Sequence, residues 1–247
     1  MYLIRTLLLF FPVGLLPAII PHNTACRKMN AETFFNAPSK PKLPVSKQAG
    51  TATNKYDEWN LKTYGLSKAA FEQAVKGFQY LQQKKMLQNT SLITIIDYSV
   101  SSSKKRLYVL DIQTGKMVFN TLVAHGRNSG LRFANSFSNE AASYKSSLGF
   151  YITRGSYTGA NGYSMRLTGC EKGINDNAFD RAIVFHGAGY VSNEFINSYG
   201  YLGRSQGCPA VPVSLNKKII DKIKNGTCMF LYAPAKSYAT RSKILDS

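Results

Sequence analysis

One cysteine of the chain lies in a segment suited to nucleophilic chemistry. Cys208 stands between Gly207 and Pro209, directly before an expected helix, so it occupies a tight turn. Backbone amides in such a turn stabilise a thiolate, and they also stabilise the oxyanion of a tetrahedral intermediate. His186 ends an apolar run and is therefore held in place to act as a general base. The alternative interpretation is a buried apolar cysteine and an unrelated structural histidine.

The number of cysteines also indicates a reactive thiol. The chain has four, and Cys170, Cys208 and Cys228 remain once Cys26 is set aside with the N-terminal leader. In an oxidising compartment an odd number cannot be fully paired within one chain. We expect Cys170 and Cys228 to be buried small residues; a disulfide between them, which would leave Cys208 free, is the alternative. The sequence has no HExxH or CxxC motif, so it predicts no metal site and no cofactor.

The elements expected to position these residues are mostly strands. Ser67 suits a helix N-cap, and apolar residues recur at three- and four-residue steps after it, which predicts a helix over 67–88. From residue 91 the apolar period changes to two, the period of a strand. The expected strands cover 92–96, 107–112, 117–124, 150–153, 182–185 and 228–232, and a second helix runs from a cap at Ser214 to Asn225-Gly226. The predicted fold class is therefore mainly β with a few helices.

The N-terminal residues have the pattern of an export signal. Arg5 precedes an apolar run over 6–20, and that run is too short for a bilayer span of roughly 20 residues. Residues 1–25 are therefore predicted to be a signal peptide. Thr24-Ala25-Cys26 is similar to a bacterial lipoprotein cleavage box, so Cys26 is a candidate for lipidation and a membrane anchor; ordinary cleavage nearby is the alternative. The protein would then be periplasmic or a membrane-anchored lipoprotein.

The rest of the chain divides by composition. Residues 26–60 are rich in Lys, Asn, Pro and Ser and predict a flexible tether. A helical appendage follows at 61–89, then a β-rich catalytic domain at 90–235 and a tail at 236–247. The formal charge is +18, from 31 basic and 13 acidic residues, which predicts an anionic partner. Export argues against nucleic acid as that partner and favours an acidic wall polymer or an anionic membrane surface. The sequence leaves the oligomeric state open.

Several segments, in order, resemble one family. His186-Gly187 followed some 20 positions later by Ser205-Gln206-Gly207-Cys208 is similar to the catalytic motif of L,D-transpeptidases. Further segments extend the likeness to the murein L,D-transpeptidase catalytic-domain family, a divergent branch, over about residues 90–232. These segments are Ala124-His125-Gly126, Asn128-Ser129-Gly130, Phe137-Ser138-Asn139, Ser147-Leu148-Gly149-Phe150-Tyr151 and Gly203-Arg204 through Pro209-Ala210-Val211.

The resemblance implies a β-sandwich catalytic domain that acts on peptidoglycan stem peptides. By that resemblance Cys208 is the nucleophile and His186 the general base. The thiolate attacks the carbonyl of the third stem residue and releases D-Ala. An amine of another stem then gives a 3→3 cross-link, or water gives carboxypeptidase activity. The amides of Gly207 and Cys208 are the oxyanion candidates, and Ser205 is expected to fix the imidazole.

The sequence departs from the family motif at two positions. Gln206 stands where the better-known branch has His, and Ala210 where it has Asn or Arg. Because Gln cannot act as a base, His186 must, and Arg204 is expected to orient the substrate. Residues expected to bind substrate are Arg204, Gln206, His125 and Tyr190. Two alternatives stay open: a carboxypeptidase or endopeptidase at the same site, and a non-catalytic peptidoglycan-binding lipoprotein.

Overall fold

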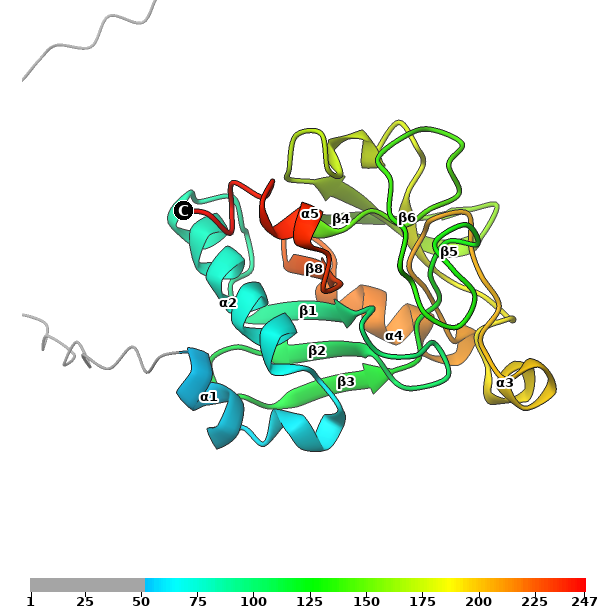
Figure 1. Cartoon of the computed structure of the whole chain (residues 1–247), viewed down its shortest axis with the longest axis horizontal. Coiled ribbons are helices and arrows are strands. Elements are labelled where there is room, and N and C mark those ends of the chain that lie inside the picture. The colour runs from blue at the N-terminus through cyan, green and yellow to red at the C-terminus, as the bar shows by residue number, and fades with distance from the viewer. Residues whose placement is uncertain (1–51) are drawn as a thin grey trace, which may run out of the picture. The chain divides into compact units, whose positions relative to one another are not determined.

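The computed structural model describes residues 52–247 (Figure 1). The predicted signal peptide, Cys26 and most of the predicted tether lie outside the described residues. Helix α1, Ala52–Glu58, falls within the range predicted as a tether. Trp59, the residue directly after it, packs edge-on against Phe71, with 5.9 Å between the centres of the two rings. No helix in the described part of the chain is long and apolar enough to cross a bilayer.

Eight strands form one hydrogen-bonded sheet in the order β3-β2-β1-β8-β4-β5-β6-β7. The strands are β1 Leu92–Asp97, β2 Leu107–Asp111, β3 Met117–Thr121, β4 Gly149–Gly159, β5 Gly162–Gly169, β6 Val184–Gly187, β7 Ala210–Val211 and β8 Cys228–Tyr232. The last strand in sequence, β8, is central: it runs parallel to β1, with Ile93 opposite Cys228, and antiparallel to β4. The prediction of a mainly β fold with a few helices is confirmed.

The two edges of this sheet meet. Ala124, which follows β3, forms an antiparallel bridge with Ala210 of β7, and the Ala124 amide donates to the Ala210 carbonyl at 2.8 Å. On its other side Ala210 is opposite His186 of β6. The short strand β7 is therefore held between β6 and the segment that leaves β3. This closure fixes the chain on either side of the predicted nucleophile.

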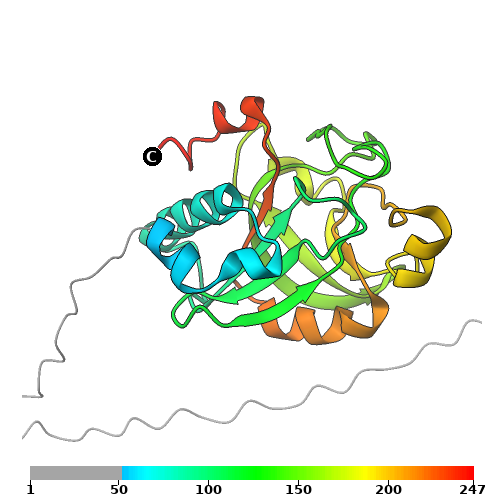
Figure 2. The same cartoon turned by 60° about the horizontal axis from the view of Figure 1, so that its bottom comes forward.

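Helices cover the sheet from both sides (Figure 2). Helix α2, Lys68–Gln83, packs against β1 and β8, and helix α4, Val213–Ile223, packs against β4, β5 and β6. Phe150 of β4 points to α2, where a Cβ on Gly77 would lie 1.9 Å from its ring. Thr153 points the other way and donates to the Ile223 carbonyl at 2.6 Å. Alternate residues of β4 thus face different helices, as the strand period requires.

The predicted helix 67–88 is confirmed as α2, though it is shorter. Ser67 is the N-cap, with its hydroxyl accepting from the Ala70 amide at 3.3 Å. The apolar positions of the helix are buried, namely Phe71, Ala74, Val75, Phe78 and Leu81. The helix ends at Gln83 because Lys85 adopts a positive φ of 55°. The second predicted helix starts earlier than expected: Pro212 precedes it, so Ser214 lies in the first turn and is not the cap.

Other elements were not predicted from the sequence. These are β5, β7, the 3-10 helices η1 Leu61–Tyr64 and η2 Asp176–Ala178, and the helices α1, α3 Asn193–Tyr199 and α5 Lys236–Ala239. Residues 236–247, which were predicted to form a tail, are bound to the rest of the domain by hydrogen bonds to Glu171. This buried carboxylate accepts from Tyr238 Oη at 3.1 Å and from Ser242 Oγ. Burial raises the pKa of Glu171.

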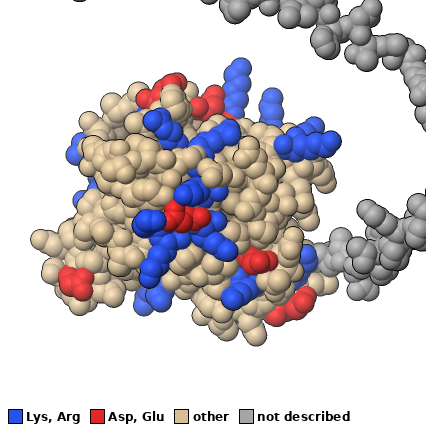
Figure 3. Space-filling model, turned by 180° about the vertical axis from the view of Figure 1, so that it is seen from behind, with Lys and Arg blue, Asp and Glu red and all other residues tan. Residues whose placement is uncertain are grey.

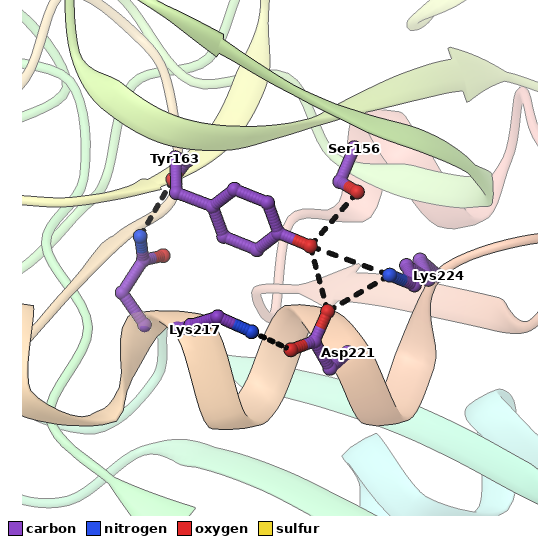
Figure 4. Close-up of polar contacts among 6 residues, drawn as sticks. Ser156, Tyr163, Lys217, Asp221 and Lys224 are labelled. Carbon is purple, nitrogen blue, oxygen red and sulfur yellow. Dashed lines mark hydrogen bonds and ion pairs between the residues drawn. The ribbon is translucent and has the colours of Figure 1, made fainter.

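A polar network ties α4 to β5 (Figure 4). Tyr163 Oη donates to Asp221 Oδ1 at 2.6 Å, and Lys224 Nζ lies 2.8 Å from the same oxygen. Lys217 pairs with the other carboxylate oxygen at 2.5 Å. Asn216 donates to the Tyr163 carbonyl at 2.6 Å. Ion pairs this exposed add little stability, but the network fixes α4 beside the strand that pairs with His186.

Candidate active site

A cavity of about 540 Å³ collects most of the predicted site residues. Cys208, His186, Ser205, Arg204, Gln206 and Tyr190 line it. The other lining residues are Arg127, Ala142, Tyr144, Asn161, Arg181 and Ala182. Of the residues singled out from the sequence, Gly207 and His125 are not among the lining residues. The structure therefore brings together a thiol, an imidazole and three guanidinium groups.

Strand pairing brings Cys208 and His186 to this cavity. β6 and β7 are parallel, and His186 is opposite Ala210, two residues after Cys208. The His186 amide also donates to the Pro209 carbonyl at 3.4 Å. On the same strand the Val184 amide donates to Cys208 Sγ at 3.4 Å. This proximity cannot be deduced from the order of the elements along the chain, because it depends on β6 and β7 being neighbours in the sheet.

Cys208 is a buried thiol with an 8% exposed fraction. Burial raises its pKa, because a thiolate is poorly solvated in this position. Three neighbours oppose that effect and lower the pKa: the Val184 amide, the Arg181 guanidinium and the amide of Cys208 itself. The net pKa is raised, so the resting group is a thiol at neutral pH. Nucleophilic attack at this position therefore needs a base to take the proton.

His186 has the protonation state of such a base. Its Nδ1 lies 3.0 Å from the Gly187 carbonyl oxygen, which accepts and does not donate, so the proton is on Nδ1 and Nε2 keeps its lone pair. Burial lowers the pKa of His186 below its ordinary 6.5, and the Gly187 hydrogen bond opposes this more weakly. The imidazole is therefore neutral at pH 7 and ready to accept a proton.

Ser205 stabilises the cysteine turn. Its hydroxyl donates to the Cys208 carbonyl at 2.6 Å and accepts from the Gly207 amide at 3.0 Å. These bonds close the turn, whose Gly207 has a φ of +122°. The expected contact between Ser205 and the imidazole is therefore replaced by contacts within the turn. Because the Gly207 amide already has an acceptor, the Cys208 amide is the better oxyanion donor of the two candidates.

His125 lies apart from the cavity and is fully buried. Its Nδ1 is 2.7 Å from Arg106 Nη2, and its Nε2 is 3.1 Å from the Gly130 carbonyl. Burial and the neighbouring Arg106 lower its pKa to about 3. Both ring nitrogens are thus occupied, and the expectation of a substrate contact does not fit this placement. His125 instead links the buried Arg106 to the loop that carries Arg127.

Three cavity residues had no signal in the sequence: Arg127, Tyr144 and Arg181. The Arg127 guanidinium carbon stacks 3.9 Å from the centre of the Tyr144 ring. Arg204 Nη1 donates to the Arg127 carbonyl at 3.2 Å, so these two arginines come from adjoining loops of the wall. The lining residues include no Asp or Glu. The cavity is consequently suited to a ligand with carboxylate groups.

The other two cysteines among residues 52–247 are free thiols. Cys228 is buried in the central strand and Cys170 is partly exposed, with no disulfide between them. Burial raises the pKa of both thiols. Neither lines the cavity. Cys208 is thus distinguished by its position beside a neutral imidazole and a guanidinium.

A buried thiol, a neutral histidine and a turn closed by Ser205 lie at one cavity, and these are the groups that cysteine-dependent acyl transfer requires. Residues 62–232 match the family model described as the L,D-transpeptidase catalytic domain. The match covers well over half of the chain, and the protein belongs to this family. The match also begins within the predicted helical appendage and includes α2.

Solved structures resemble the chain at low identity. An L,D-transpeptidase from Mycobacterium smegmatis is 12% identical, with a TM-score of 0.36, covering 58% of this chain and 59% of that chain. The helical cell shape determining protein Pgp2 from Campylobacter jejuni is 14% identical, with a TM-score of 0.39 and coverages of 69% and 59%. An L,D-transpeptidase from Xylanimonas cellulosilytica is 16% identical, with a TM-score of 0.34 and coverages of 79% and 100%. No curated protein matches the chain.

Proposed function

We propose that the protein is an exported L,D-transpeptidase that forms 3→3 cross-links in peptidoglycan through a Cys208 acyl-enzyme. The observation that carries the proposal is the pairing of β6 with β7, which puts Cys208 and a neutral His186 on one cavity. Family membership supplies the substrate class. The alternative outcome at the same acyl-enzyme is hydrolysis, which makes the protein an L,D-carboxypeptidase.

The first half of the reaction forms the acyl-enzyme. His186 Nε2 takes the Cys208 proton as the sulfur attacks the carbonyl carbon of the third stem residue. The Cys208 amide stabilises the oxyanion of the tetrahedral intermediate. When the intermediate collapses, the bond to the terminal D-Ala breaks, and the imidazolium returns its proton to the leaving amine. The product is a thioester on Cys208 and free D-Ala.

The second half transfers the acyl group. A side-chain amine of another stem attacks the thioester carbonyl while His186 accepts its proton. Collapse releases the Cys208 sulfur, which regains the proton from the imidazolium, and an amide cross-link forms. If water attacks instead, the thioester is hydrolysed to a carboxylate. The cavity size and its arginines favour binding of carboxylate-bearing stems, because no lining residue carries a negative charge.

The charge of the molecule supports a location at the wall. Figure 3 shows many Lys and Arg side chains and few acidic ones on the face seen from behind. Helix α4 contributes Lys217, Lys218 and Lys222, and Lys224 follows directly after it. A basic surface favours contact with the carboxylates of wall polymers.

Export and lipidation of Cys26 belong to the same proposal. We expect the substitution Cys26→Ser to move a membrane-bound protein to the soluble periplasmic fraction.

The activity is tested by incubating the purified protein with disaccharide tetrapeptides and weighing the products. A dimer that has lost one D-Ala is the expected result, together with a mass adduct on the Cys208 peptide. Cys208→Ala should abolish both, whereas the matched control Cys170→Ala should retain both. Loss of D-Ala without a dimer would make the protein a carboxypeptidase. The absence of any product or adduct would contradict catalysis and leave peptidoglycan binding alone.

A further inference from the structure

The cavity contains a guanidinium that organises one whole loop. Arg181 lies just before β6 and donates four hydrogen bonds, all to residues of the segment 138–147. The acceptors are the carbonyls of Ser138 and Lys145, at 2.8 and 2.6 Å, and the hydroxyls of Ser147 and Ser143, at 2.9 and 3.2 Å. A planar guanidinium with five donors can hold such a set, and a lysine cannot.

Every one of these acceptors is neutral. The ion pairs among residues 52–247 do not involve Arg181, and the residues lining its cavity include no acid. Burial consequently lowers the pKa of Arg181. A partly buried cation without a carboxylate is costly to maintain. Its charge is therefore available to an anion that forms in the cavity during a reaction.

Two ionisable groups interact electrostatically with Arg181, the Tyr151 phenol and the Cys208 thiol, and Cys208 is the one that lines the cavity. A Cβ added to Gly207 would lie 3.3 Å from Arg181 Nη2 and 2.8 Å from the Lys145 carbonyl. The guanidinium and the segment it holds thus lie directly against the residue before the nucleophile. The electrostatic effect is consistent with this placement, since Arg181 lowers the pKa of the Cys208 thiol.

The segment held by Arg181 also contacts the cysteine turn itself. Ser146 Oγ donates to the Gly207 carbonyl at 3.1 Å and accepts from the Gly126 amide at 3.0 Å. The other cavity arginines are engaged elsewhere, Arg127 on Tyr144 and Arg204 on the Arg127 and Gly130 carbonyls. Gln206 carries no charge. Among the three arginines of the cavity, Arg181 is the one that both donates hydrogen bonds to the segment 138–147 and lowers the pKa of the Cys208 thiol.

We propose that Arg181 is a positioning residue for the nucleophile: it clamps the segment 138–147 against the Cys208 turn and stabilises the sulfur anion by its unneutralised charge. The inference rests on Cys208 being the nucleophile of the proposed function. It goes further by assigning the electrostatic support of the thiolate to a side chain far from the cysteine in sequence. Both parts of the role can be measured without peptidoglycan.

The test is the pH dependence of Cys208 alkylation by iodoacetamide, read by peptide mass spectrometry on the folded protein. Removing an opposite charge near an ionisable group shifts its pKa by about one unit or more. We expect Arg181→Gln to move the midpoint upward by about one pH unit, with alkylation about tenfold slower at pH 8. Arg181→Lys should restore much of the midpoint, because the charge is kept, while losing the hydrogen bonds to the segment.

Controls separate charge from folding. Arg154→Gln removes an exposed arginine that bonds Thr168, and its midpoint should equal the wild type. Ser147→Ala removes one acceptor and keeps the charge, so hydrogen exchange in 138–147 should rise with little change in midpoint. Equal midpoints in Arg181→Gln, Arg181→Lys and wild type would overturn the proposal, as would unchanged exchange in Ser147→Ala. A shifted midpoint in a protein that makes no peptidoglycan product would refute the proposed function and leave only the effect of Arg181 on the Cys208 thiolate.

Discussion

Two histidines of this protein occupy similar places in the sequence and in the sheet, yet they differ in chemistry. Each is followed by glycine, in His125-Gly126 and His186-Gly187. They also lie on either side of β7: His186 is opposite Ala210, and on the other side Ala210 pairs with Ala124, the residue before His125. The local sequence therefore does not decide which imidazole is a base, whereas a difference of one residue in strand position turns the two side chains to opposite faces.

The difference lies in what each ring nitrogen contacts. His125 accepts from Arg106 at Nδ1 and donates to Gly130 at Nε2, so both nitrogens serve the fold. His186, which lines the cavity, uses Nδ1 for the Gly187 carbonyl, and this bond leaves its other nitrogen with a lone pair. A histidine becomes available for catalysis when the fold satisfies one nitrogen and leaves the second to the substrate.

The largest expected effect is on catalysis, and it should be confined to His186. His186→Gln removes the proton acceptor, and general-base catalysis contributes about 10²- to 10⁴-fold. We expect kcat/KM for tetrapeptide stems to fall by that factor while the melting temperature stays close to wild type. His125→Gln is the matched control, because its amide can still accept from Arg106 and donate to Gly130. Equal losses of kcat/KM in the two variants would contradict the comparison.

The second effect is on stability, and it should be confined to His125. His125→Leu removes one acceptor of the buried Arg106 guanidinium, which keeps the Val123 and Val100 carbonyls, and one donor to the Gly130 carbonyl, which keeps Arg204. Two lost hydrogen bonds, one of them to a charged group, cost about 2 to 4 kcal/mol. Urea unfolding should show that loss in the free energy of unfolding, with the folded fraction keeping most of its activity. A His125→Leu protein as stable as wild type would show that Arg106 does not depend on this imidazole.

A third effect is a pH dependence of stability that also distinguishes the two rings. His125 has a pKa of about 3 in the folded state, against an ordinary 6.5 in the unfolded chain. Since the folded value is depressed, the stabilisation is present above pH 6.5 and is lost as the pH falls toward 3. The expected slope is about 1.4 kcal/mol per pH unit for one proton.

His186 contributes in the same direction over a narrower range, since its pKa is also lowered. His125→Gln should therefore reduce the slope more than His186→Gln does. The measurement is urea unfolding at several pH values between 4 and 7. If His186→Gln gave the larger reduction, the assignment of the more depressed pKa to His125 would be wrong.

Much of the sheet could be predicted from the sequence because its strands are apolar at every second position or throughout. The residues of β1 and β8 are all buried, which produces runs that are easily recognised. By contrast, β5 is partly exposed and bounded by Gly162 and Gly169, so its pattern is weak. Helix α3 has no buried residue, and an amphipathic period cannot identify it.

The candidate site was predictable where the chemistry is local. The turn around Cys208 and the strand end at His186 are visible in the sequence, and the structure places both on one cavity. The contributions of Arg181 and His125 were not predictable, because they depend on contacts with residues distant along the chain. A single sequence does not reveal which arginine meets which loop.

The central place of β8 has a consequence for synthesis. Because β8 pairs with β1 and β4, the ribosome makes the strand that joins the two halves of the sheet after every other strand. Pairing of segments so distant along the chain is intrinsically slow. The Cys208 thiol therefore exists on the nascent chain before the domain that buries it is complete. During that interval it is as accessible to oxidants as any cysteine of an unfolded polypeptide.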